Sequence, residues 1–267
     1  MSNAIPIGAV TETNKALQHY LDVVIILAEK DFKIRYRNSV LGFLWSLLNP
    51  LAYMVLLWIV FSFLLRVSIP NFAAWLLIGL LIWRFFAVGT MQGLTSIVGN
   101  PSLINRIYVS RYIVVLSNNV ANLLGSSLEF MALLPMLVFF GVTPNTMALL
   151  LPLLLLLEFL LIFALSLSLA ALNLKYRDFG QLWDIALQLG FFLSPIVYDA
   201  SLIPPRYQLL YFLNPVTRII DSTRDIFLRS RSPSGTDFLV IVTCISVLLC
   251  IGTLIFRSLE PKFAEEI

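Results

Sequence analysis

The sequence carries no charged side chain between Arg37 and Arg66. A helix of roughly 20 apolar residues crosses the hydrocarbon core of a membrane, about 30 Å thick, so this segment is long enough to span it. Because no water is available there, the backbone must pair its own groups within a helix. Further apolar segments of the same kind follow. The pattern therefore predicts an all-α protein embedded in a membrane.

Composition supports a single membrane domain over residues 1–267. Hydrophobic residues make up 59% of the chain and charged residues 12%, whereas a soluble domain is about 25% charged. Spans and short connections thus use nearly the whole chain. The net charge of +3 does not suggest nucleic acid as a partner. With one histidine, and with Cys244 and Cys250 in an apolar run at no metal-binding or redox spacing, we expect no metal site.

Six segments are expected to cross the membrane. They lie at residues 40–65, 72–90, 113–141, 147–172, 181–198 and 237–256. The first segment is longer than a span requires, and a kink or tilt at Asn49-Pro50 would accommodate its extra length. Before it, apolar residues at helical spacing over 14–37 predict an amphipathic helix on the membrane surface. Between the last two, residues 199–236 hold proline-broken apolar stretches, which suit re-entrant or interfacial helices.

Lysine and arginine near the span ends predict the orientation, because cytoplasmic segments carry an excess of both. With the N-terminus inside, the inner segments hold eleven of these residues and the outer ones six, so both termini are expected in the cytoplasm. Five of the six outer charges fall within 199–236, against the trend. Either the other spans fix the topology and this loop is translocated, which we prefer, or the span count is off by one.

The pattern G-x-x-x-x-G-K-[ST], which cradles nucleotide phosphates, is absent. If ATP drives this protein, a separate subunit binds ATP and Mg²⁺, and this chain is a transport subunit without a cofactor or enzymatic activity. An embedded enzyme that transfers a sugar phosphate to a lipid is the weaker alternative. Asp178 and Asp184 are the only nearby acidic pair that could serve such chemistry.

Charges inside spans are costly and merit attention. Four occur: Arg84, Glu129, Glu158 and Asp184. We expect Arg84 to pair with one acidic residue and the others to lie near a span end or a wet cavity. A proton relay is less favoured, because it usually needs a chain of acidic residues and histidine.

Aromatic residues make up 13% of the chain and gather in the first two spans. They are simply explained by interfacial belts and packing. Alternatively, they line a conduit, since the apolar C–H faces of sugar rings stack on aromatic rings. The residues expected to line such a channel are Tyr53, Trp58, Phe61, Trp83, Phe86 and Phe191.

A basic cluster precedes the first span and consists of Lys30, Lys33, Arg35 and Arg37. Such side chains suit phosphate groups. The membrane's own anionic lipids could equally occupy the cluster.

Two short polar segments on the cytoplasmic side offer surfaces that a soluble partner could push on. Their residues are Asn100, Pro101 and Arg106 in the first, and Tyr176, Arg177 and Asp178 in the second. Ordinary anchoring by basic residues explains them as well.

An ordered set of motifs runs from about residue 29 to the C-terminus. It comprises Asp31-Phe32-Lys33-Ile34-Arg35-Tyr36-Arg37-Asn38-Ser39, Leu41-Gly42, Trp45, Asn49-Pro50, Tyr176-Arg177-Asp178, Ser194-Pro195-Ile196-Val197-Tyr198, Asn214-Pro215 and Arg224. In this order the set resembles the membrane subunits of type-2 ABC exporters, which export O-antigen, teichoic acid and capsule polymers.

The resemblance implies a homodimer of six-helix subunits above a soluble ATPase dimer, in the bacterial inner (cytoplasmic) membrane. It also implies coupling segments at 94–111 and 173–180, and two short re-entrant helices on the outer side covering 199–216. The implied substrate is a lipid-linked polysaccharide, moved from the cytoplasmic face through a channel along the subunit interface. On this resemblance, the pyrophosphate of the lipid carrier is expected to meet the basic cluster of Lys30, Lys33, Arg35 and Arg37. A drug or lipid exporter on the same scaffold is the alternative.

Overall fold

The structure, a computed structural model, describes residues 7–36, 44–64, 66, 69–101, 110–143 and 145–263. Within these ranges it is nearly all helical and contains no strand, which confirms the all-α fold class. The longer helices are α1 (Ile7–Tyr36), α2 (Leu44–Ile59), α3 (Phe72–Thr95), α5 (Arg111–Phe139), α6 (Leu151–Lys175), α7 (Phe179–Leu193) and α10 (Gly235–Leu259). The shorter ones are η1 (Val60–Leu64), η2 (Thr146–Leu150), η3 (Ala200–Leu202), α8 (Pro205–Tyr211), α9 (Pro215–Phe227) and η4 (Glu260–Lys262).

Five described stretches are long and apolar enough to cross a membrane. They are Leu44–Phe63, Phe72–Thr95, Arg111–Phe139, Thr146–Lys175 and Gly235–Leu259, and they match five of the six expected spans. The expected span 181–198 corresponds to α7, which has 15 residues and so reaches only about 22 Å. It ends before Ser194-Pro195, because the residue before a proline is disfavoured in a helix. The sixth crossing stays a prediction.

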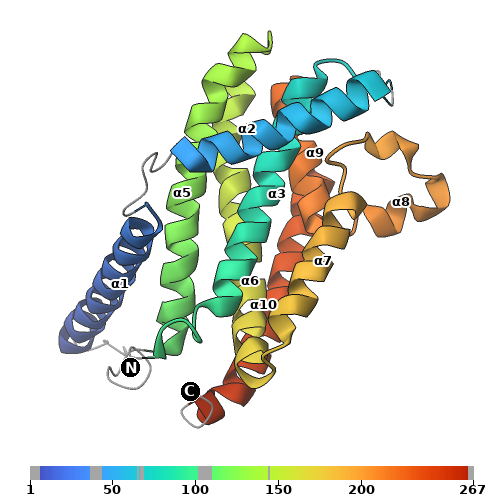
Figure 1. Cartoon of the computed structure of the whole chain (residues 1–267). Helices are drawn as coiled ribbons and strands as arrows, with labels where there is room; N and C mark the ends of the chain where they lie inside the picture. Colours follow the sequence, from blue (N-terminus) through green and yellow to red (C-terminus); the bar gives the residue numbers. More distant parts are fainter. Residues whose placement is uncertain are drawn as a thin grey trace, which may run out of the picture.

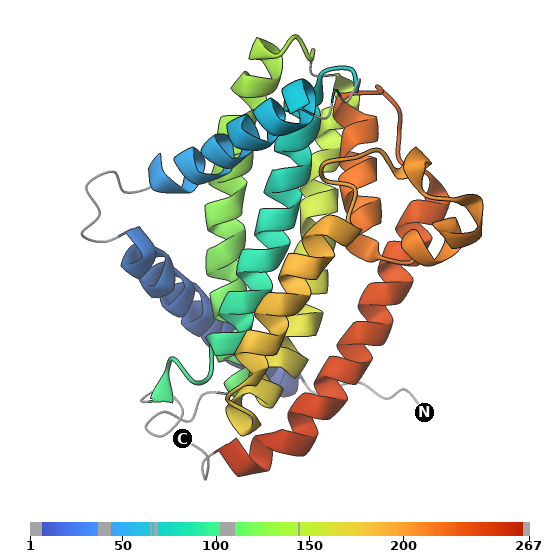
Figure 2. The ribbon, with the colours of Figure 1, turned by 45° about the vertical axis from the view of Figure 1, so that its right-hand side comes forward.

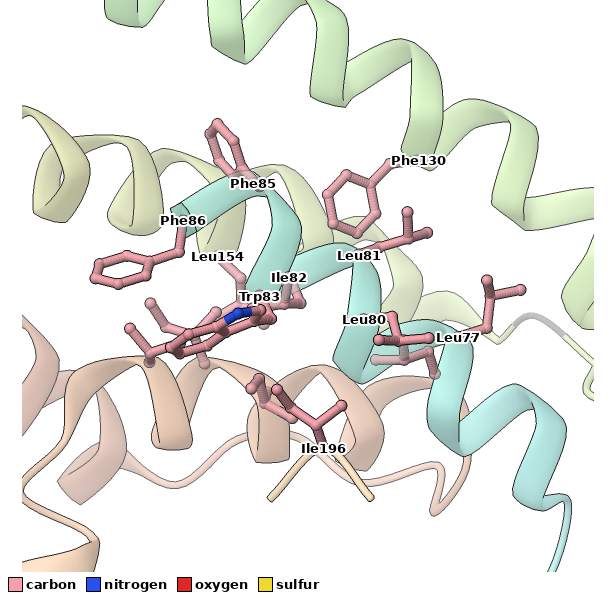
Figure 3. Packing of buried hydrophobic residues seen from close by; sticks show 14 of the residues in the cluster. Leu77, Leu80, Leu81, Ile82, Trp83, Phe85, Phe86, Phe130, Leu154 and Ile196 are labelled. Atoms are coloured by element: carbon pink, nitrogen blue, oxygen red, sulfur yellow. The ribbon is translucent and has the colours of Figure 1, made fainter. Parts of the chain in front are cut away.

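Helix α3 forms the centre of the bundle. Its span is 78% buried, against 17% for the span in α10. Figure 3 shows side chains of α3, such as Leu81 and Phe85, among residues of other elements, including Phe130 of α5, Leu154 of α6 and Ile196. Any movement of α3 would therefore shift the side chains that pack on it from most of the core.

The long helices alternate in direction (Figures 1 and 2). Helices α3, α6 and α10 run one way and α5 and α7 the other. The turns after α3 and α6 consequently lie at the same end as the last turn of α10, while η2, α8 and α9 lie toward the opposite end. Which end faces the cytoplasm stays a prediction.

The helix expected at 14–37 is present as α1, and it begins earlier, at Ile7. It packs beside the lower half of α5, with Val24 and Ala28 buried (Figure 1). Its location on the membrane surface stays a prediction. Helix α2, with Pro50 inside it, passes obliquely across the upper part of the bundle instead of running alongside α3 (Figures 1 and 2).

A buried polar seam joins α3, α5 and α6. Asn122 Nδ2 donates to a carbonyl of α3 at 3.2 Å, and Ser166 Oγ donates to Asn119 Oδ1 at 3.4 Å. The helices approach closely because α3 presents glycine: a Cβ on Gly89 would lie 2.5 Å from Asn122, and one on Gly93 would overlap Ser166. Small residues and interhelical hydrogen bonds hold helices together in membranes.

Candidate functional site

An open groove of about 640 Å³ lies between α2, α3 and α7. Its lining includes Tyr53, Trp83, Gln92, Asp184, Gln188 and Phe191. The groove combines aromatic rings with amide and carboxylate groups at an accessible surface.

Three of the six aromatic residues predicted for a channel meet in this groove. The ring centroids of Tyr53 and Phe191 are 6.1 Å apart, and those of Trp83 and Phe191 are 6.2 Å apart. Phe86 is largely buried and lies behind them, 5.6 Å from Trp83. A Cβ on Gly190 would lie 2.8 Å from the Trp83 ring, so that glycine lets the ring rest against α7.

The structure does not bring the other two predicted residues to the groove. The ring of Trp58 packs 5.7 Å from Phe63, and that of Phe61 lies 6.4 Å from Phe72. Trp58 lies five positions after Tyr53, so its side chain points about 140° away around the helix. Composition alone could not distinguish these faces of α2.

Asp184 and Gln188 give the groove its polar side. Gln188 Nε2 donates to Asp184 Oδ2 at 2.9 Å, and both side chains are exposed. Asp184 was expected near a span end or a wet cavity, where a charge is tolerated. Its exposed side chain lies at the groove, and the presence of water there stays a prediction. The sequence already contains a signal for this grouping, which was missed, because positions 184, 188 and 191 share one face of a helix.

The other charges within spans behave in two ways. Arg84 Nε lies 3.2 Å from Glu129 Oε2, which confirms the expected ion pair. Glu158 was expected near a span end or a wet cavity, and this was wrong. It is fully buried near the middle of its span, and neither carboxylate oxygen has a hydrogen-bond partner among the described residues. The packing of α3, α5, α9 and α10 around α6 removes it from water.

We expect the Glu158→Met variant to unfold at a higher temperature than the wild type. Methionine removes two unsatisfied buried oxygens, and such a group costs about 1–3 kcal/mol. Thermal unfolding of the purified chain in detergent measures the effect. Glu129→Met is the control and should be destabilised, because it leaves Arg84 without its carboxylate. A lower melting temperature for Glu158→Met would contradict the argument.

Two lysines of the predicted basic cluster are already paired. Lys33 Nζ lies 2.5 Å from Glu29 Oε1, and its hydrogen bond and charge hold the pKa of Glu29 below its usual range. Lys30 Nζ lies 3.1 Å from Asp31 Oδ1 and donates to Asn100 Oδ1 at 3.2 Å. These contacts offset part of the positive charge. Phosphate binding by the cluster stays a prediction.

The Lys30–Asn100 hydrogen bond also joins α1 to the first predicted coupling segment. Pro101, next in the chain, is exposed. The turn between α6 and α7 exposes the three residues predicted for the second segment, Tyr176, Arg177 and Asp178. Both turns lie at the same end of the bundle (Figures 1 and 2). Three further predicted site residues, Arg37, Arg106 and the side chain of Arg35, lie outside the described residues.

Comparison with known proteins gives consistent matches over almost the whole chain. Residues 22–228 match the family described as ABC-2 type transporter. The chain is 30% identical to the O-antigen export system permease protein RfbA of Klebsiella pneumoniae, covering 93% of this chain and 96% of that protein. It is 31% identical to RfbA of Myxococcus xanthus, covering 95% and 98%. It is 22% identical to the polysialic acid transport protein KpsM of Escherichia coli, covering 86% and 91%.

Proposed function

Because this chain belongs to the ABC-2 type transporter family of membrane proteins, we propose that it is the membrane subunit of a polysaccharide exporter. Relatives that match it over nearly their whole length are named as permeases for O-antigen export, and a more distant one as a polysialic acid transport protein. The observation that carries the proposal is the groove in which aromatic rings face Asp184 and Gln188.

The groove suits a sliding glycan. Sugar rings have apolar C–H faces that stack on aromatic side chains such as Tyr53 and Trp83. Their hydroxyl groups can donate to the Asp184 carboxylate and exchange hydrogen bonds with the Gln188 amide. Each such contact is weak, so successive sugars can replace one another. The glycan would travel on a lipid anchor such as a polyprenyl pyrophosphate.

Two copies of this chain would enclose the path. In a single copy the groove is open, and a carboxylate facing lipid is costly. A second copy placed against α2 and α7 would exclude lipid and keep water around Asp184. The exposed apolar side chains on this side of α7, among them Leu189 and Phe192, suit such an interface.

A separate ATPase dimer would supply the energy, with ATP and Mg²⁺ bound there, because this sequence has no phosphate-binding loop. It would press on the turns around Asn100 and Arg177 from the cytoplasm. The chain would then lie in the bacterial inner membrane with both termini inside. The excess of lysine and arginine in the inner segments supports that orientation.

Deleting the gene tests the function as a whole. Lipid-linked polymer trapped in the cytoplasm, with surface glycan restored by the intact gene, is the expected result. Unchanged surface glycan would favour a drug or lipid exporter on the same scaffold. Loss of the polymer itself would favour an enzyme.

Groove variants test the path. We expect Tyr53→Ala and Gln188→Ala each to lower surface polysaccharide about three- to ten-fold. An aromatic contact contributes about 0.5–1.5 kcal/mol beyond its area, and a hydrogen bond contributes about 0.5–1.5 kcal/mol. Both side chains are exposed in the isolated subunit, so folding should not suffer. Trp58→Ala is the matched control from the same helix. Wild-type levels of surface polysaccharide in all three variants would exclude this groove as the path.

A further inference from the structure

The turn after α7 leaves backbone groups in need of partners. The helix ends at Leu193, and Pro195, which cannot donate a hydrogen bond, follows. Pro195 and Ile196 are both buried, away from water. A buried carbonyl without a partner is costly, most of all within a membrane protein.

Arg224 of α9 supplies the missing donors. Its side chain is 0% exposed. One terminal nitrogen donates to the carbonyl of Pro195, and the other donates to the carbonyls of Ile196 and Trp75, both at 3.1 Å. Arg224 thus joins three elements: α9, the turn after α7, and α3.

An aromatic ring and a glycine of α3 lie directly against the Arg224 guanidinium. It lies 3.9 Å from the centroid of the Trp75 ring, in a cation–π contact. A Cβ on Gly79, one turn further along α3, would lie 2.7 Å from Arg224 Nη2. Arg229 lies 5.4 Å from the same Trp75 ring. It is paired in turn with three carboxylates, those of Asp199, Asp221 and Asp225.

The same turn is tied to the wall of the groove. Tyr198 Oη donates to the carbonyl of Phe192 at 3.1 Å, and Tyr211 Oη donates to Tyr198 Oη at 3.2 Å. Phe192 and its neighbour Phe191 line the groove. The position of this end of the wall therefore depends on the turn that Arg224 holds.

We propose that Arg224 is a positioning residue for export. It fixes the end of α7 against α3 and so sets the width of the groove beside Phe191 and Phe192. Lysine cannot replace it, because a compact ammonium lacks the planar fork that reaches three carbonyls while stacking on an indole. The inference rests on the proposed function.

The test uses the purified transporter, this chain together with its ATPase, in vesicles. The variants are Arg224→Lys, Arg224→Gln and Gly79→Ala, the last of which displaces the guanidinium without removing it. We expect polymer exported per ATP hydrolysed to fall by about five-fold or more, the effect of losing about one hydrogen bond. Amide hydrogen exchange over residues 194–203 should rise, with exchange in α6 unchanged.

Two controls separate positioning from general damage. Arg206→Gln removes an exposed arginine of α8, and Gly235→Ala adds a Cβ where nothing lies within 4 Å. Both should match the wild type. If Arg224→Gln fails to assemble, the other two variants still decide the question.

Wild-type polymer yield per ATP in both Arg224→Lys and Gly79→Ala would overturn the proposal. A smaller amount of complex with an unchanged yield per ATP would also overturn it, since Arg224 would then serve folding alone. Failure of the proposed function looks different, because the wild type itself would then move no polysaccharide. The exchange measurement would still report whether Arg224 holds the turn.

Discussion

The Gly93→Ala variant is expected to lose about 2 kcal/mol of folding stability, at the middle of the range for overpacked cores. The added methyl would occupy the space of Ser166 Oγ and Cβ, so α3 and α6 must separate. Alanine's better helix propensity, at most about 1 kcal/mol, offsets only part of this cost. Unfolding of the purified chain in detergent measures the loss.

The double variant Gly93→Ala/Ser166→Gly should recover most of the stability, because it removes both overlapping atoms. Such a coupling between two changes identifies a direct contact. Gly180→Ala is the control, since its nearest atoms lie at 3.6 and 3.7 Å, an ordinary contact. Additive losses in the double variant would show that the seam does not pack as described.

Breaking the ion pair between Arg84 and Glu129 is expected to have the second large effect. Either Arg84→Met or Glu129→Gln should cost about 3 kcal/mol, because the remaining group stays inside a span without its counter-charge. The exposed fraction of the Glu129 side chain is 9%, so water can do little to screen it. Denaturant unfolding of the purified variants measures the cost.

The combined variant Arg84→Met/Glu129→Leu should have a free energy of unfolding within about 1 kcal/mol of that of the wild type, since paired removal leaves neither partner as an uncompensated charge. Comparing the combined variant with the single ones separates two quantities: the cost of leaving one charge unpaired, and the net contribution of the ion pair to stability. A combined variant as unstable as the sum of the single ones would mean that the charges do more than neutralise each other.

Much of the fold could be predicted from the sequence because the membrane imposes it. Apolar length decides which segments become spans, and five of the expected ones are matched by helices. Pro195 indicated where α7 ends, and the prolines within 199–236 indicated that only short helices precede α10. A kink or tilt was expected at Asn49-Pro50 in the first span. Span length alone, however, does not give the size or direction of a tilt, which depends on packing, and so the oblique course of α2 across the bundle could not be derived.

The candidate site was only partly predictable because it is built from distant segments. Tyr53 and Phe191 lie far apart in the chain and meet only when α2 and α7 pack beside α3. Glu158 and Arg224 show the same limit for charged residues. One is buried without a partner and the other is bound to backbone carbonyls, and neither situation leaves a sequence pattern.

The central helix α3 can also be viewed as a lever. Its 24 residues form a rod about 36 Å long. Its lower end leads into Asn100, which α1 holds, and near its upper end the carbonyl of Trp75 accepts from Arg224. Tilting such a rod by about 5° about one end moves the other by about 3 Å, the length of a hydrogen bond. If the ATPase presses on the turns as proposed above, a tilt of this size would break the hydrogen bond between Arg224 and the carbonyl of Trp75.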